Sequence, residues 1–292
     1  EELIMLQHLE KKNVTMLPGL FRERMLVNRN YLLELGTQEL LQNYYLEAGI
    51  VMPDLQVLEK PETAKLHWGW EAPTCQLRGH FLGHWLSAAS SLIASENDAA
   101  LKAKLDEIIS ELARCQELNG GEWIGPFPEK YFTRLEKELD IWSPQYVMHK
   151  LIMGLTHAYL YADNEQALTI VRHLADWYIR WTEKVQSTNP HAVYSGEESG
   201  MLEMWAQLFE TTKDPVYETL ASRYSNPSLF HNLSEGKDAL TNCHTNSSIP
   251  WAHGAARMYE VTGDEKYKTI VELFWKCAVT DRGYFCAGSA NS

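Results

Sequence analysis

Residues 79–98 read Gly-His-Phe-Leu-Gly-His-Trp-Leu-Ser-Ala-Ala-Ser-Ser-Leu-Ile-Ala-Ser-Glu-Asn-Asp, a polar motif followed by an apolar stretch and a short polar turn. Apolar residues recur here at helical spacing, and residues 98–117 continue that spacing with Leu and Ile. Asp or Asn at such a turn is a favoured N-cap of the following helix. The segment therefore predicts two helices joined by a tight turn, an αα-hairpin.

The same arrangement recurs three more times along the chain. The expected helix pairs are 80–94 with 98–117, 144–161 with 164–184, 198–211 with 214–224, and 249–261 with 264–278. Repeated helix pairs indicate stacked hairpins, in either a solenoid or a closed toroid. Short turns alternate with long loops, which favours the toroid, and β-strand signals are nearly absent. We therefore expect a single all-α domain over residues 1–292.

Outside these hairpins the sequence predicts one further helical stretch and several irregular segments. A helical pattern runs from Phe21 to Gly49, after an amphipathic lead-in over residues 1–20. Pro and Gly mark the expected loops, which cover residues 50–78, 118–141, 185–197 and 225–248, and the tail after Arg282 is expected to be non-helical.

A polar motif opens the first helix of every pair, and each motif lies about one helix length from its turn. A helix rises about 1.5 Å per residue, so stacked hairpins would place all four motifs at one end of the assembly, roughly 25 Å from the turns. We expect a substrate-binding site there. The candidate residues are His80, His84, Trp142, Gln145, His149, Glu198, His244 and Asn246.

Each of these motifs also has a purely structural interpretation. His80 and His84 share a helix face and could bind a metal, but Phe81 stands where the zinc-binding His-Glu-x-x-His pattern needs Glu, so a polar lining is the simpler alternative. Trp142 can pack in the core, His149 can bond a loop carbonyl, and Glu198 can interact with a helix N-terminus.

Composition excludes several classes of protein. The net charge of −13 argues against nucleic acid or an anionic membrane as a partner. No apolar run of about 18 residues appears, so no transmembrane span is expected. Five scattered Cys without a Cys-x-x-Cys pair, and no visible signal peptide, favour a reducing, cytoplasmic location. Ten Trp and fourteen Tyr can build the core or provide platforms for sugar rings.

The motifs together resemble glycoside hydrolase family 127 and the related family 146, the β-L-arabinofuranosidase-like proteins. The resemblance covers most of residues 20–292. It rests on Gly69-Trp70-Glu71, on the string from Leu77 to Ala88, on Trp142-Ser143-Pro144-Gln145-Tyr146 with His149, on Glu198-Ser199-Gly200-Met201 and on the string from His244 to Pro250.

This resemblance implies an (α/α)6 barrel and a retaining hydrolase of β-L-arabinofuranosides or related plant-glycan sugars. It also implies a zinc-held cysteine thiolate as nucleophile and a glutamate as acid/base. In the family these groups follow the segment that here ends at Ser292, and none of the five Cys matches them. The expectation is therefore an incomplete toroid that binds carbohydrate. The zinc ligands and the nucleophile would lie beyond this chain, and the chain alone would bind no zinc.

Two other functions stay open on the sequence. The chain could be a non-catalytic, carbohydrate-binding helical-repeat fragment that uses the same end of the hairpins. It could also be an inverting (α/α)6 glycosidase that uses Glu198 with a second carboxylate. An incomplete toroid would expose apolar helix faces, so self-association is expected as well.

Overall fold

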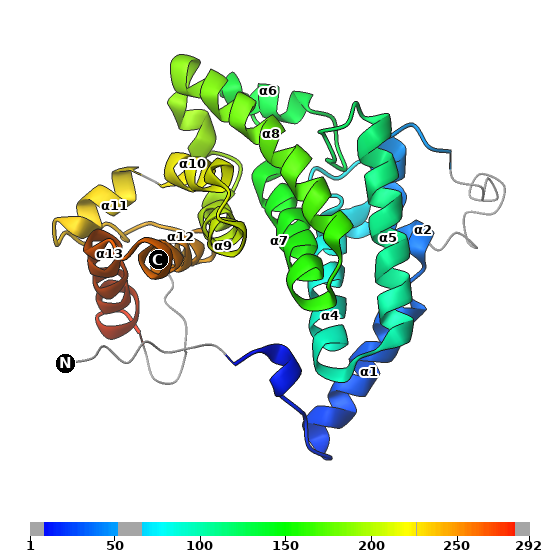
Figure 1. Cartoon of the computed structure of the whole chain (residues 1–292). Helices are drawn as coiled ribbons and strands as arrows, with labels where there is room; N and C mark the ends of the chain where they lie inside the picture. Colours follow the sequence, from blue (N-terminus) through cyan, green and yellow to red (C-terminus); the bar gives the residue numbers. More distant parts are fainter. Residues whose placement is uncertain (1–8, 52–65, 226, 284–292) are drawn as a thin grey trace. The chain divides into compact units, whose positions relative to one another are not determined.

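The computed structural model describes residues 9–51, 66–225 and 227–283, and in these ranges the chain forms helices without any strand (Figure 1). The longer helices are α1 Leu20–Glu34, α2 Thr37–Glu47, α4 His80–Glu96, α5 Ala99–Leu118, α6 Lys130–Glu136, α7 Pro144–Ala162, α8 Glu165–Thr188, α9 Met201–Thr212, α10 Pro215–Tyr224, α11 Pro227–Ser234, α12 Thr245–Thr262 and α13 Glu265–Trp275. Short helical turns are η1 Lys11–Asn13, η3 Gly69–Glu71, η4 Pro190–Tyr194, η5 Glu198–Gly200 and η6 Lys276–Thr280. The predicted all-α class of helical hairpins is confirmed.

The chain divides into two compact units. The first comprises Glu1–Phe127 and Lys150–Arg172, and the second comprises Pro128–His149 and His173–Ser292. Helices α7 and α8 each begin in one unit and end in the other. The expected single domain over residues 1–292 stays a prediction.

Two-residue turns join the helices of each pair, as the sequence predicted. The first turn residue adopts a left-handed backbone conformation, with φ between 51° and 70°, at Asn97, Asp163, Lys213 and Gly263. The second residue caps the next helix, because its side chain accepts a hydrogen bond from a backbone N–H of the first turn; these residues are Asp98, Asn164, Asp214 and Asp264. The predicted N-caps are confirmed, and each turn thus ends one helix and starts the next.

The expected single helix from Phe21 to Gly49 is two helices. The chain leaves the helical conformation at Leu35, where ψ is 126°, and Gly36 then precedes the first residue of α2. Two expected loops also contain short helices, α6 and α11, which the sequence analysis missed. Residues 1–8, 52–65 and 284–292 lie outside the described ranges, and they include parts of the expected lead-in, loop and tail, with Cys286.

Glycine permits a close crossing of α4 and α7 in the first unit. A Cβ added at Gly154 of α7 would lie 2.6 Å from the carbonyl oxygen of Gly83 in α4. Real Cβ atoms do not approach backbone so closely, so only glycine allows these two helices to touch at this point.

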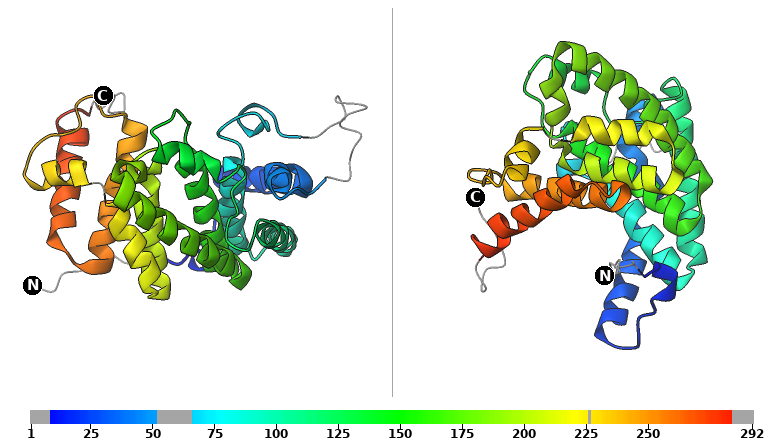
Figure 2. Two further views of the ribbon diagram at one scale, coloured as in Figure 1. Left: turned by 90° about the horizontal axis from the view of Figure 1, so that it is seen from above. Right: turned by 60° about the vertical axis from the view of Figure 1, so that its left-hand side comes forward.

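Aromatic residues build much of the core of the second unit. The ring of Phe132 contacts Trp177 and Trp181 edge-on, with centroids 4.9 Å away in both cases. Helix α9 packs on α10 and on α12, and α12 packs on α13, so the two hairpins adjoin within this unit, as the yellow and orange-to-red helices of Figure 2 show. Among the described residues, no helix combines the length and apolarity that a membrane crossing requires.

Candidate functional site

A buried carboxylate organises the polar motif of the first unit. Glu71 accepts hydrogen bonds from the backbone N–H groups of Gly79 and Phe81, at 2.7 and 3.0 Å, and lies 2.7 Å from Nδ1 of His80. Burial by itself would raise the pKa of Glu71, but these hydrogen bonds together lower it. Glu71 is therefore held as a carboxylate that anchors the first turn of α4.

This carboxylate also fixes the tautomer of His80. Nδ1 lies within hydrogen-bond distance of Glu71 and of the carbonyl oxygen of Leu77, at 3.0 Å. Both partners are acceptors, so we assign a proton to Nδ1. His80 was predicted from the sequence; Glu71 was part of the Gly69-Trp70-Glu71 string that carries the resemblance but was not predicted as a site residue.

His84 lies one helical turn after His80, with its ring centroid 5.9 Å away. Partial desolvation, then the positive charge of Lys150 and the neighbouring His80, lower the pKa of His84 to about 4. The side chain is exposed and is neutral at physiological pH. A neutral imidazole that can hydrogen-bond suits a neutral polar ligand.

Gln145, in the second unit, is fully buried and bonded to its own chain. Its side-chain nitrogen donates to the carbonyl oxygens of Val193 and Ser195, at 3.0 and 2.6 Å, and its oxygen accepts from the Tyr224 hydroxyl at 2.5 Å. These contacts hold η4 against the start of α7. A substrate-binding role for Gln145 stays a prediction, and the described contacts are structural.

His149 packs directly against Gly200. A Cβ added at Gly200 would lie 2.5 Å from Cε1 and 2.6 Å from Nε2 of the imidazole. His149 itself is buried, with 7% of its surface exposed. The Glu198-Ser199-Gly200 motif therefore needs glycine at its third position to accept the histidine.

Glu198 is the buried carboxyl group of the second unit. Only 4% of it is exposed, and its Oε1 accepts one hydrogen bond, 3.3 Å long, from Nε1 of Trp251. Burial is the main cause that raises its pKa to about 7, with a smaller contribution from Glu197. A carboxyl group of this pKa can give or take a proton near neutral pH. Trp251, its partner on α12, was not predicted.

The three remaining predicted residues are exposed. Trp142 precedes α7 and has 47% of its surface exposed. His244 and Asn246 lie at the start of α12, the helix that also carries Trp251 and packs on η5. In the second unit the structure thus places His149 of α7 against Gly200 of the turn that carries Glu198, and α12 packs on the same turn.

The described residues do not provide a zinc site. Within residues 9–51, 66–225 and 227–283, no three His, Cys, Asp or Glu side chains gather as metal ligands would. Four described cysteines are free thiols, and burial raises the pKa of Cys115 to about 12, which keeps that thiol protonated. The cysteine ligands and nucleophile implied by the resemblance have no counterpart in these ranges.

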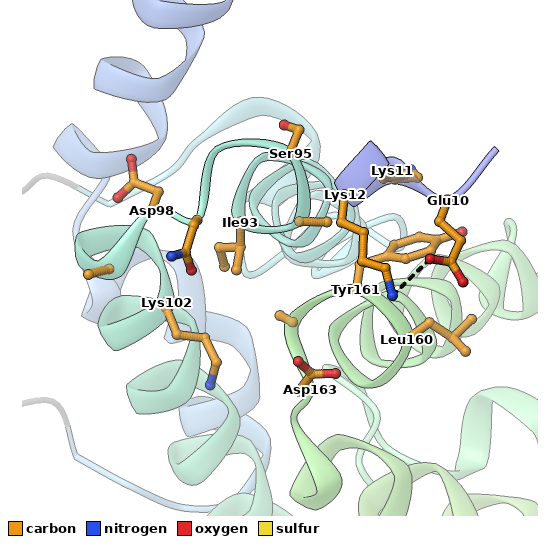
Figure 3. Close-up of a pocket in the computed structure, with 14 residues that line it drawn as sticks. Glu10, Lys11, Lys12, Ile93, Ser95, Asp98, Lys102, Leu160, Tyr161 and Asp163 are labelled. Atoms are coloured by element: carbon orange, nitrogen blue, oxygen red, sulfur yellow. Dashed lines mark ion pairs between the residues drawn. The ribbon is translucent and has the colours of Figure 1, made fainter. Parts of the chain in front are cut away.

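A pocket of about 720 Å³ lies at the turn end of the first unit, where α4 and α7 finish, rather than at their motif end (Figure 3). Its charged groups are largely paired: Lys12 with Glu10 at 2.8 Å, Lys102 with Asp106, and Asp98 with an arginine of α1. Paired charges attract a ligand weakly. The chemistry-bearing groups therefore lie elsewhere.

Comparison with protein families identifies a hydrolase of glycosidic bonds. The model of the β-L-arabinofuranosidase, GH127 catalytic domain matches residues 13–292. The chain belongs to this family, which makes it a glycosidase of the β-L-arabinofuranosidase type, with carbohydrate as its substrate. No curated protein matches the chain.

Proposed function

We propose that this chain supplies the sugar-binding part of a retaining hydrolase that removes β-L-arabinofuranosyl units from plant-type glycans. The family match over residues 13–292 supports the proposal most directly. The chemistry of the predicted residues agrees with it, because the neutral imidazole of His84 and a carboxyl group with a pKa of about 7 suit the hydroxyl groups of an uncharged sugar.

In the first unit, His80 and His84 are the proposed hydroxyl-binding pair. Glu71 holds a proton on Nδ1 of His80, so a sugar hydroxyl is proposed to bond Nε2, while His84 can donate or accept. Because His84 is neutral above a pKa of about 4, binding needs no change of protonation across the physiological range.

In the second unit, Glu198 is the proposed proton-handling group. Its pKa of about 7 leaves the protonated and ionised forms similarly populated near neutral pH. In the retaining proposal it binds sugar hydroxyls, together with His149 and with His244 and Asn246 at the start of α12. The zinc and the thiolate nucleophile do not fit the described residues, so those residues are assigned no step of the displacement.

Calorimetric titration of the chain with methyl β-L-arabinofuranoside tests the sugar-binding proposal. We expect binding, with His84→Ala weakening the affinity about tenfold through loss of a hydrogen-bonding group in the site. The matched control is His173→Ala, an exposed histidine of α8, which should leave the affinity unchanged. Equal binding of the α- and β-anomers, or no binding of either, would contradict the proposal.

An inverting mechanism is a second candidate, and the pKa of Glu198 favours it. A carboxyl group that is still partly protonated at pH 7 can act as a general acid, and inversion also needs a second carboxylate roughly 6.5–9.5 Å away. NMR of the first anomer released from a β-L-arabinofuranoside separates the two mechanisms, because retention gives the β-sugar and inversion the α-sugar. Catalysis by the chain without added metal that is abolished in Glu198→Gln would support inversion.

A further inference from the structure

The loop before α4 presents two tryptophans to solvent. Trp68 and Trp70 each have 64% of their surface exposed, and a single glycine separates them. Tryptophan is highly buried on average, so two exposed indoles within three residues need an explanation. Exposed apolar groups of this size commonly mark a binding surface.

Side chains of helix α2 hydrogen-bond the backbone of this loop. Gln42 bonds both the N–H and the C=O of His67, at 2.8 and 2.9 Å, and also the C=O of Glu71 at 2.9 Å. Asn43 donates a further bond to the same Glu71 carbonyl, at 2.9 Å. The backbone is thus clamped on both sides of residues 68–70. Preorganised groups lose little conformational entropy when a ligand binds.

The residue between the tryptophans permits this geometry. Gly69 has φ of +66°, in the left-handed region that favours glycine, and no atom lies within 4 Å of where its Cβ would be. The loop therefore turns sharply at Gly69, with an exposed indole on each side. Since Glu71 is the last residue of η3 and contacts His80, the same short turn carries the exposed indoles and the carboxylate that positions the histidine.

Trp70 directly adjoins the polar pair. Its ring meets that of His80 edge-on, with ring centroids 6.2 Å apart. The ring centroids of His80 and His84 are in turn 5.9 Å apart. An apolar platform therefore borders hydrogen-bonding groups. A sugar ring presents the matching surfaces, an apolar C–H face and a rim of hydroxyl groups.

We propose that Trp70, flanked by Trp68, forms a second sugar subsite that stacks the ring next to the one held by His80 and His84, so that the preferred ligand is an oligosaccharide rather than a single arabinofuranosyl unit. This inference rests on the proposed function, because it takes the histidine pair as the first sugar position. It adds what that function leaves open, namely recognition of the neighbouring unit of the glycan.

Calorimetry with two ligands tests the subsite: methyl β-L-arabinofuranoside, which has one ring, and the methyl glycoside of a β-L-arabinofuranosyl disaccharide, which has two. Trp70→Ala should weaken disaccharide binding about tenfold, as expected for loss of an aromatic stacking partner, and change monosaccharide binding less than twofold. Trp70→Phe should keep part of the disaccharide affinity that Trp70→Ala loses. Trp68→Ala should also weaken disaccharide binding selectively, but by a smaller factor. Trp275→Ala is the matched control, since Trp275 of α13 is 63% exposed, and it should change neither affinity.

Three results would overturn the inference. Equal losses for both ligands in Trp70→Ala would make Trp70 a support of the first sugar position. Unchanged affinities for both ligands would remove its role altogether. Absence of binding of either ligand by the wild-type chain would overturn the proposed function together with the subsite, and this outcome differs from the other two because it does not depend on any variant.

Discussion

Two buried glutamates, one in each unit, have side-chain pKa values that are shifted in opposite directions. Glu71 has 9% of its surface exposed and Glu198 has 4%, so burial alone would raise the pKa of both. The pKa of Glu71 is nevertheless lowered, whereas that of Glu198 rises to about 7. The difference lies in their hydrogen bonds: Glu71 interacts with two backbone N–H groups, the Asn43 amide and a histidine, while Glu198 receives its own backbone N–H and one 3.3 Å bond from Trp251.

Hydrogen bonding to the charged form therefore decides which role each carboxyl group can take. A carboxylate that is fully bonded stays ionised and can orient a neighbour, as Glu71 orients His80. A carboxyl group that is buried with few donors keeps its proton near neutral pH and can exchange it, as proposed for Glu198. Substitutions at Glu71 and Glu198 test this contrast, and a substitution at Gly200 tests the packing beside Glu198.

Removal of the Glu71 carboxylate should have the largest effect. Glu71→Leu leaves two backbone N–H groups without their acceptor and removes the carboxylate partner of His80, so we expect the free energy of unfolding to fall by about 3–5 kcal/mol. Glu71→Gln keeps one acceptor oxygen and should cost about 1–2 kcal/mol. Urea denaturation at pH 7 measures both. Glu117→Gln, at an exposed position of α5, is the control, and a loss of similar size there would contradict the assignment.

Replacement of Glu198 should change how stability depends on pH. Because the pKa rises from 4.5 to about 7 on folding, the folded state keeps a proton that the unfolded chain releases in this range. The free energy of unfolding due to this group is therefore highest below pH 4.5 and falls by about 3 kcal/mol as pH rises through 7. Denaturation of the wild type and of Glu198→Gln at pH 5, 6, 7 and 8 measures the difference. Parallel curves would show that Glu198 does not titrate in this range.

The smallest of the three effects is expected at Gly200. A Cβ there would overlap the imidazole of His149, so Gly200→Ala should cost about 1–3 kcal/mol of stability through overpacking. In a His149→Ala background the same substitution should cost less than about 1 kcal/mol, because the clashing ring is gone. Chemical denaturation of the four proteins completes this cycle. Equal costs in both backgrounds would mean that the glycine serves another purpose.

The hairpins could be predicted because their signals are local. Each turn places an αL residue and a capping Asp or Asn side by side, and the apolar periodicity on either side gives the helices. The break at Gly36 was missed because apolar residues continue at helical spacing across it. Helices α6 and α11 were missed because they are only 7 and 8 residues long. Such short helices show too little periodicity to be detected between Gly and Pro signals.

The candidate site was predictable in its residue types more than in its contacts. The motifs identified His80, His149 and Glu198, and the structure makes all three buried polar groups. Their partners are distant in sequence: Trp251 is 53 residues from Glu198, and Tyr224 is 79 residues from Gln145. Such pairings depend on tertiary packing, which the spacing of one motif does not encode.

The two-residue turns also bear on how the chain acquires its structure. Both helix ends at a turn are determined by adjacent residues, such as Lys213 and Asp214, without help from distant segments. A hairpin built in this way closes a very short loop and forms mostly contacts between near neighbours, which is the topology that folds fastest. Hairpin formation can therefore precede the slower docking of buried partners such as Trp251 and Glu198, so the scaffold should be established before the site.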